Sequence, residues 1–214
     1  TFNCGTVQDA GVTRIGDDNW FMAYVHVAHD CVVGNRTIFA NCTQLAGHVH
    51  VGDWVILGGF TGIHQFCRIG AHSMTAIASV VVHDLPPYVM AGGNTAKAHG
   101  LNTEGLKRRG FSPAAINGIR KAYKTLYREK LTLEQARQAL AEQVSECPEV
   151  GILVDFLGAS TRIVTRPKEK ALKPGPLCDI ENAPQSAQVR QLTEPLNDGC
   201  LGRVEDQHQR DCHA

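Results

Sequence analysis

The sequence predicts a parallel β-helix built from six-residue repeats and followed by a small α-helical domain. The first observation is an unbroken series of ten apolar residues at every sixth position from Ile15 to Ile69. The second is that a small or β-branched residue stands four places after nearly all of them, as Val49 and Thr61 do. An α-helix would repeat apolar residues near every 3.6 positions and a half-buried strand at every second position, so neither explains the pattern. Six-residue repetition is typical of a β-helix in which three repeats close one coil.

The β-helix is predicted within residues 1–100. After the regular repeats, Pro86 and Pro87 and then the Gly92–Asn94 cluster argue against further ladder pairing, so the region up to residue 100 is expected to be an irregular exit strap. The chain begins at Thr1 in what reads as strand sequence, and we therefore expect earlier coils to be missing.

Residues 101–166 change to a helical period and are predicted to form a C-terminal helical domain. Ser112 is a predicted N-cap followed by a proline, and Thr132 opens a predicted capping box. A third helix is expected over residues 149–159. Residues 167–214 show no sustained periodicity and are predicted to be a disordered tail.

Composition excludes several functional classes. The 21 basic and 21 acidic side chains cancel, which gives no global attraction to nucleic acid or to a membrane surface. No apolar run is long enough for a membrane span, and the start of the chain has no signal-peptide pattern. We therefore expect a cytoplasmic protein with no nucleic-acid partner and no stable membrane insertion.

Three histidines and a carboxylate gather on one edge of the predicted coil. Residues three repeats apart lie above one another, and this arithmetic places His29, Asp30, His48 and His64 at one corner on successive coils. A histidine beside an aspartate can act as a general base at neutral pH. Several neutral imidazoles could instead bind zinc and leave a coordination position for water. From the residues alone, both chemistries remain open.

Five segments give the chain a family resemblance. It resembles the UDP-N-acetylglucosamine O-acyltransferases in the runs His26–Cys31, Leu45–Val49, Ile63–Cys67, Pro86–Val89 and Asn102–Phe111. The resemblance covers about residues 1–166 and implies a left-handed parallel β-helix. It implies transfer of a 3-hydroxyacyl chain from acyl carrier protein to the 3-hydroxyl of UDP-N-acetylglucosamine, the first step of lipid A biosynthesis. It further implies a homotrimer with active sites between adjacent subunits, and no cofactor or metal.

The resemblance also implies roles for individual residues. His29 would be the general base, oriented by Asp30, and the backbone N–H of Gly47 would donate to the oxyanion. The residues expected to bind or position the sugar nucleotide are His26, His48, His64, Gln65, Asn102, Glu104, Arg108 and Arg109.

Two further expectations concern the acyl donor. Ile77 stands where relatives that handle longer chains have glycine, so we expect a preference for a shorter acyl chain of about ten carbons. The predicted helical domain carries basic residues that offer a local positive face to an acidic carrier protein, namely Arg120, Lys121, Lys124, Arg128 and Lys130.

Alternative functions remain in view. Another hexapeptide acyltransferase, such as the N-acyl enzyme of the same pathway or an acetyl-CoA enzyme, would share the coil, although the Asn102–Phe111 run argues against it. A zinc-dependent γ-class carbonic anhydrase would share both the coil and the trimer. A non-catalytic structural remnant is the third alternative.

Overall fold

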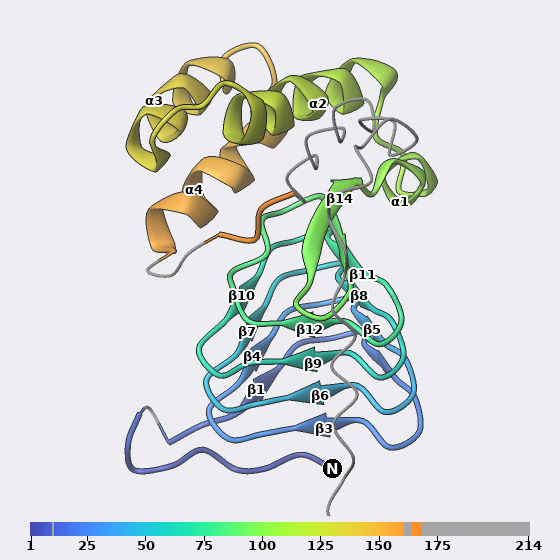
Figure 1. Cartoon of the computed structure of the whole chain (residues 1–214). Coiled ribbons are helices and arrows are strands. Elements are labelled where there is room, and N and C mark those ends of the chain that lie inside the picture. Colours follow the sequence, from blue (N-terminus) through green and yellow to red (C-terminus); the bar gives the residue numbers. More distant parts are fainter. Residues whose placement is uncertain (10, 161–163, 168–214) are drawn as a thin grey trace, which may run out of the picture. The chain divides into compact units, whose positions relative to one another are not determined.

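The repeats form a parallel β-helix (Figure 1). The computed structural model describes residues 1–9, 11–160 and 164–167, all within one compact unit, so the predicted tail lies outside the described residues except at residue 167. Each coil contributes one two-residue strand to each of three sheets, and strands three repeats apart pair in register, as Val27 does with Leu45. The predicted coil of three repeats is confirmed.

The three sheets are named here by their first strands. The β1 sheet contains β1 (Arg14–Ile15), β4 (Val32–Val33), β7 (His50–Val51) and β10 (Arg68–Ile69). The β2 sheet contains β2 (Trp20–Phe21), β5 (Ile38–Phe39), β8 (Ile56–Leu57), β11 (Met74–Thr75), β13 (Val89–Gly92) and β14 (Lys97–Leu101). The β3 sheet contains β3 (His26–Val27), β6 (Gln44–Leu45), β9 (Gly62–Ile63) and β12 (Val80–Val81).

The large residue of each repeat fills the interior. Phe39, Leu45 and Leu57 are fully buried, and the reduced cysteines Cys31 and Cys67 lie among them as small apolar fillers. Ile15, in the first regular coil, is partly exposed. Removing these side chains from water on successive coils provides the main stabilisation of the helix.

The turns between the strands share one backbone conformation. Every sixth residue from Asp18 to Ala78 has a positive φ, between 53° and 63°, although none of them is glycine. Aspartate and histidine, found here at Asp30, His48 and His72, tolerate this left-handed conformation better than most residues. Because the turns superpose from coil to coil, side chains at one turn position form a column along the edge of the coil.

These columns define three corners. The histidine corner joins the β3 sheet to the β1 sheet through residues 28–31, 46–49 and 64–67. The arginine corner joins the β1 sheet to the β2 sheet through residues 34–37, 52–55 and 70–73. The third corner joins the β2 sheet back to the β3 sheet through residues 40–43, 58–61 and 76–79.

The expected exit strap is partly wrong. Residues Val89–Gly92 continue the β2 sheet as β13, with Met74 paired to Met90, and β14 then pairs antiparallel to β13. The prolines do not prevent this pairing because Pro86 and Pro87 lie before the strand begins. The glycine-bearing cluster forms the hairpin turn instead.

Within the part of the chain that the structure describes, four α-helices follow: α1 (Thr103–Arg108), α2 (Pro113–Arg128), α3 (Leu133–Gln143) and, after the short helix η1 (Pro148–Val150), α4 (Gly151–Ala159). Ser112 caps α2 and Thr132 forms a complete capping box with Gln135, as predicted. Helix α1 was not predicted. No helix among the described residues is both long enough and apolar enough to span a membrane.

Candidate active site

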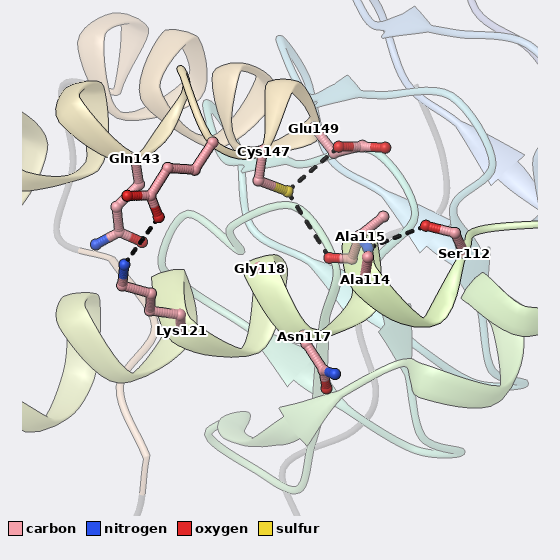
Figure 2. A pocket seen from close by; sticks show the side chains of 10 residues that line it. Ser112, Ala114, Ala115, Asn117, Gly118, Lys121, Gln143, Cys147 and Glu149 are labelled. Atoms are coloured by element: carbon pink, nitrogen blue, oxygen red, sulfur yellow. Dashed lines mark hydrogen bonds and ion pairs between the residues drawn. The ribbon is translucent and has the colours of Figure 1, made fainter.

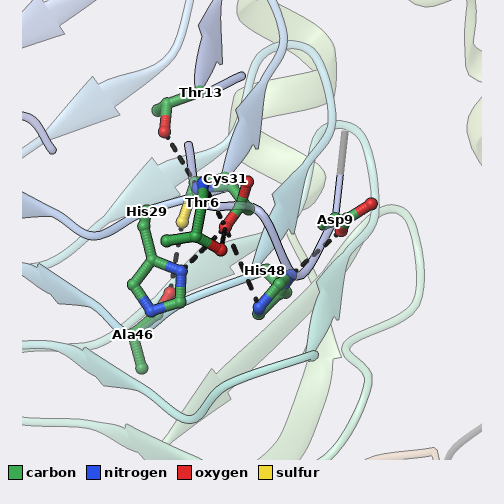
Figure 3. Close-up of polar contacts among 8 residues, drawn as sticks. Thr6, Asp9, Thr13, His29, Cys31, Ala46 and His48 are labelled. Carbon is green, nitrogen blue, oxygen red and sulfur yellow. Dashed lines mark hydrogen bonds and ion pairs between the residues drawn. The ribbon is translucent and has the colours of Figure 1, made fainter. Parts of the chain in front are cut away.

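The histidine corner brings a base and a carboxylate into direct contact. His29 follows strand β3, and its Nδ1 atom lies 2.9 Å from Oδ2 of Asp30, the next residue (Figure 3). The His29 side chain is 37% exposed, whereas the Asp30 side chain is 2% exposed. A buried carboxylate therefore holds one ring nitrogen of an imidazole that is itself partly exposed.

A loop near the start of the chain buries that carboxylate. Twelve positions separate Phe2 from Arg14, whereas only five separate their strand partners Val27 and Val32, so the loop inserts seven residues at this corner. Its Thr6 donates to Asp30 from both the backbone N–H, at 2.9 and 3.1 Å, and the hydroxyl, at 2.7 Å.

These hydrogen bonds set the charge of Asp30. The Thr6 hydroxyl, more than any other group, lowers the pKa of Asp30 to about 2, and the His29 ring also lowers it, although burial of the carboxyl opposes both. The Asp30 N–H in turn donates to Oγ1 of Thr13 at 2.9 Å. Asp30 is thus an anion at neutral pH, suited to stabilise an imidazolium on His29.

His48 lies one coil further along the same column as Asp30. Its Nε2 is 4.0 Å from Oδ2 of Asp30, its Nδ1 is 3.0 Å from Oδ2 of Asp9, and its ring meets that of His29 edge to face at 5.1 Å. Phe66 stacks on its other side, with ring centroids 4.6 Å apart. His48 is therefore fixed from three directions.

Sequence reasoning missed Thr6 and Asp9, which both reach the site from the inserted loop. The available signal was the break in the six-residue register at Gln8–Gly11, which was interpreted only as a projecting loop. The loop lies one coil before His29 and at the same corner, so its position in the sequence already indicated that it would lie next to His29.

Gly47 lies directly against the imidazole of His29. A Cβ atom added at Gly47 would lie 2.5 Å from Cε1 and 2.7 Å from Nε2 of His29, far inside contact distance. Only glycine lets the ring occupy this place, and the turn backbone thereby approaches the reactive nitrogen closely.

Three other predicted residues lie near this corner but outside the contact cluster. His64 and Gln65 are exposed on the coil after His48, and His64 Nδ1 donates to the Gln65 carbonyl at 3.1 Å. His26 is on the outer face of β3, with Nδ1 2.7 Å from Oγ1 of Thr1. The prediction that His29, Asp30, His48 and His64 share one corner agrees with the strand register, but only the first three are in mutual contact.

The contact cluster also has the composition of a metal site. His29, Asp30 and His48 each offer one ligand atom, and these atoms lie within 4.8 Å of one another. Two imidazoles and a carboxylate suit zinc, which leaves the metal-dependent alternative chemically feasible.

The residues predicted on the nucleotide side lie at a different corner. Glu104 and Arg108 are exposed on α1 and line a cavity of about 590 Å³ against the β2 sheet, whose floor includes Ile56 and Met74. Asn102, just before α1, is 5% exposed, and Arg109, just after it, is half-buried. The arginine corner, beside the cavity, and the histidine corner, which carries His29, lie on opposite edges of the β1 sheet. They are one six-residue repeat apart, or roughly 20 Å of extended chain.

Ile77 lies at the third corner and is 71% exposed. Two other large side chains of this corner, Tyr24 and Phe60, are exposed by 83% and 63%. The third corner therefore presents an apolar edge on the outside of the coil.

A cavity in the helical region offers no comparable chemistry. It measures about 470 Å³ and lies between α2 and the segment that joins α3 to η1, where Sγ of Cys147 contacts the Ala115 carbonyl and the Glu149 carboxylate (Figure 2). Burial and the nearby carboxylate raise the pKa of the Cys147 thiol. A protonated buried thiol is a poor nucleophile, so we do not assign this cavity a catalytic role.

Comparison with known proteins agrees with both the coil and the helices. Residues 84–165 match the family model described as the second domain of UDP N-acetylglucosamine O-acyltransferase, and residues 13–47 match the bacterial transferase hexapeptide model. The chain is 63% identical over 166 residues to the acyl-[acyl-carrier-protein]--UDP-N-acetylglucosamine O-acyltransferase of Thiobacillus denitrificans, an alignment that covers 78% of this chain and 64% of the relative.

Solved structures give the same result. The UDP-N-acetylglucosamine O-acyltransferase of Moraxella catarrhalis superposes with a TM-score of 0.76 at 46% identity, covering 78% of this chain and 65% of that one. An Acinetobacter baumannii relative gives 0.75 at 48% identity, covering 77% and 64%. The left-handed parallel β-helix with C-terminal helices is confirmed. The chain spans less than two thirds of the length of these relatives, and over that span both its coil and its helices are similar to the UDP-N-acetylglucosamine O-acyltransferases.

Proposed function

We propose that the protein transfers a 3-hydroxyacyl chain from acyl carrier protein to the 3-hydroxyl of UDP-N-acetylglucosamine. The observation that carries this proposal is the His29–Asp30 pair packed against Gly47. It supplies a base, a fixed anion and a closely approaching backbone turn at one accessible place. These are the parts that acyl transfer to a hydroxyl requires.

The chemistry follows from the hydrogen bonds. Because Nδ1–H of His29 donates to the Asp30 carboxylate, the Nε2 lone pair is available to remove the proton of the sugar hydroxyl. The hydroxyl oxygen attacks the thioester carbonyl, and the oxyanion accepts a hydrogen bond from the Gly47 N–H. Collapse of the intermediate breaks the C–S bond, and His29 returns its proton to the departing thiolate. Asp30 stabilises the imidazolium between these two proton transfers.

His48 has a supporting place in this scheme. It is held between Asp9, Asp30 and the Phe66 ring, so its position is fixed before any substrate binds. We assign it, with His26, His64 and Gln65, to sugar binding on the rim around His29. These roles rest on the family resemblance and on the placement of all four residues at or beside the histidine corner.

A homotrimer would complete the site. The base lies at the histidine corner, the cavity of Glu104 and Arg108 lies beyond the arginine corner, and Ile77 lies at the third corner. One sugar nucleotide with its acyl chain cannot contact all three regions of a single coil, because full sheet faces separate them. Side-by-side packing of copies would bring the histidine corner of one against the β2 sheet of the next.

The acyl donor would use two further surfaces. The basic residues of α2 and the turn after it, Arg120, Lys121, Lys124, Arg128 and Lys130, are all exposed and offer a positive face to an acidic carrier protein. The acyl chain is a separate matter from the carrier protein. It would run along the apolar third corner, where the Ile77 side chain limits its length to about ten carbons. A faster rate with a donor of about fourteen carbons than with one of about ten would contradict the limit. Because acyl carrier protein, the proposed donor, is found in the cytoplasm, we propose that the protein is located there as well.

The direct test is an assay of acyl transfer from 3-hydroxyacyl carrier protein to UDP-N-acetylglucosamine, with His29→Ala as the control. We expect a single ester product that the variant does not form. Equal turnover with acetyl-CoA and a different acceptor would favour another hexapeptide acyltransferase. If no acyl donor is turned over, the remaining hypothesis is that the protein is a non-catalytic structural remnant.

A zinc-dependent hydratase is the second candidate, favoured by the cluster of His29, Asp30 and His48. Metal analysis of the purified protein distinguishes the two. Stoichiometric zinc with carbon dioxide hydration would favour the hydratase, whereas acyl transfer that persists in a chelator would exclude it.

A further inference from the structure

Helix α1 is too short to hold its own orientation. It spans six residues, Thr103–Arg108, and isolated helices of this length are not stable in water. Its direction nevertheless decides where Glu104 and Arg108 point. The groups that fix it must therefore come from the residues at its two ends and from what they contact.

Asn102 fixes the start of the helix. Its Oδ1 accepts from the N–H of Gly105 at 3.2 Å, and its Nδ2 donates to the backbone carbonyl of His72 at 3.0 Å. The side chain is 5% exposed, and a Cβ at Gly105 would strike it. Asn102 therefore joins α1 to the arginine corner rather than presenting its amide to solvent.

Arg109 fixes the end of the helix at the same corner. Its Nη2 donates to the Trp54 carbonyl at 2.8 Å and its Nη1 lies 3.3 Å from Nδ1 of His72. Its guanidinium carbon also lies 5.3 Å from the centre of the Trp54 ring. Two of the five N–H donors of the guanidinium, and one of its faces, are thus directed toward the coil.

The surface that receives these two residues is a rigid aromatic column. Trp54 and His72 lie on successive coils with ring planes 9° apart and centroids 6.2 Å apart, and Tyr88 continues the stack at 5.6 Å from His72. Burial, with a smaller effect of Arg109, lowers the pKa of His72 to about 4. His72 is thus neutral at physiological pH, and its Nδ1 can accept from Arg109.

Arg108 has different surroundings from its neighbour. Both arginines line the 590 Å³ cavity, but Arg108 is exposed in the last turn of α1, whereas Arg109 is half-buried against Trp54 and His72. Adjacent arginines in one basic run are therefore placed for different tasks. Of the two, only Arg108 has its charge fully available in water at the cavity rim.

We propose that Asn102 and Arg109 are positioning residues, which clamp the two ends of α1 onto the Trp54–His72–Tyr88 column so that Arg108 is presented to the cavity. Arg108 makes the direct contact with the anionic part of the ligand, whereas Arg109 acts through the helix. The identity of that ligand as a sugar nucleotide rests on the proposed function. The clamp itself does not.

Two matched variants test the clamp. In Arg109→Lys the charge is kept, but the single ammonium group cannot reach both the Trp54 carbonyl and the His72 ring. We therefore expect the amide hydrogens of α1 to exchange at least about tenfold faster in the ligand-free variant than in the ligand-free wild type. We expect KM for UDP-N-acetylglucosamine to rise about tenfold while kcat changes little. In Arg108→Lys, KM should rise while α1 exchange stays at the wild-type rate.

The outcomes separate the clamp from the proposed function. An Arg109→Lys variant with wild-type exchange in α1 would overturn the clamp, whether or not its KM rises. Because exchange is measured without ligand, the result stands even if the wild-type protein transfers no acyl chain, an outcome that would count against the proposed function alone. Asn102→Ser, which loses the bond to His72, should reproduce the exchange effect of Arg109→Lys.

Discussion

Two histidines occupy the same turn position of the coil and have opposite surroundings. His48, at the histidine corner, faces Asp30 and Asp9, and its corner is open to solvent at His29. His72, four repeats later at the arginine corner, faces Arg109 and stacks between Trp54 and Tyr88. Both have a positive φ near 60°. The backbone therefore provides identical positions, and the neighbouring side chains decide whether a corner supports proton transfer or rigid attachment.

The same contrast holds for the segments that cover the two corners. The inserted loop near the N-terminus donates hydrogen bonds to a carboxylate and leaves the adjacent imidazole accessible. Helix α1 covers its corner with a buried amide and a half-buried guanidinium. The inserted loop keeps Asp30 ionised beside the accessible His29, whereas the contacts at the arginine corner hold α1 in place.

The largest effect is expected from His29→Ala. Loss of the general base should lower kcat for acyl transfer by about 10² to 10⁴-fold, because no other group described at the corner replaces Nε2. The exposed His99 provides the matched control, since it lies on β14 away from the corner, and His99→Ala should retain wild-type turnover. Equal losses in both variants would remove the distinction between the corner and an ordinary surface histidine.

Gly47→Ala should follow closely. The new methyl group would enter the space of the His29 ring and displace Nε2 from its reactive position, and a misplacement of about 1 Å can cost about 10²-fold in rate. Gly62→Ala is the control, because a Cβ at Gly62 has no atom within 4 Å. Steady-state assays of both variants, after their thermal stability is matched, make the measurement. A fully active Gly47→Ala enzyme would contradict the placement of the ring.

A smaller, pH-dependent effect is expected from Thr6→Val. The Thr6 hydroxyl is the main cause of the lowered pKa of Asp30, so its removal raises that pKa and lets the carboxyl protonate at a higher pH. The acid limb of the kcat/KM profile should therefore move upward in pH, with about a tenfold loss on that limb and little change at neutral pH. Thr6→Ser retains a hydroxyl and should keep the wild-type profile. Superimposable profiles for valine and serine would show that the loop does not control Asp30.

The smallest effect belongs to the arginine corner and appears in stability rather than in rate. The pKa of His72 is lower in the folded state than in the unfolded state, so the unfolded chain binds the extra proton as the pH falls from about 6.5 to about 4. The stability contributed by neutral His72 is present above this window and is lost through it. In His72→Phe, the free energy of unfolding should depend less on pH across the window, by about 1–3 kcal/mol.

Urea unfolding at several pH values measures that difference. The comparison of slopes, rather than of absolute stability, removes the separate loss of the Arg109 hydrogen bond. Identical pH dependence in wild type and variant would mean that His72 does not titrate abnormally.

The sequence predicted the coil and its contents well because the six-residue period is a one-dimensional signal. Val27, Leu45 and Ile63 stack because three repeats separate each from the next, and the same arithmetic brings Asp30 beneath His48. Capping residues such as Ser112 and Thr132 are equally local, and their helices began where expected.

The sequence could not predict contacts made across irregular segments. Thr6 reaches Asp30 only because the loop folds back over the corner, and no period encodes a fold-back. Likewise, Asn102 and Arg109 were grouped with Arg108 as ligand contacts, because burial against Trp54 and His72 depends on the path of the chain after the coil. Strand β13 was missed because two prolines outweighed the alternation that follows them.

The proposed active site is complete only when the histidine corner of one copy meets α1 of another. Two variants can be co-expressed with different tags and the mixed trimers isolated: His29→Ala, which lacks the base, and Arg108→Ala, which binds the sugar nucleotide too weakly to turn over at low substrate concentration. If the site is shared between copies, each mixed trimer has one complete site, so mixed trimers should regain activity in about a third of their sites, although each variant alone is inactive at low concentrations of the sugar nucleotide. Mixed trimers as inactive as the separate variants would show that both residues must lie on the same chain, which would contradict a site shared between copies.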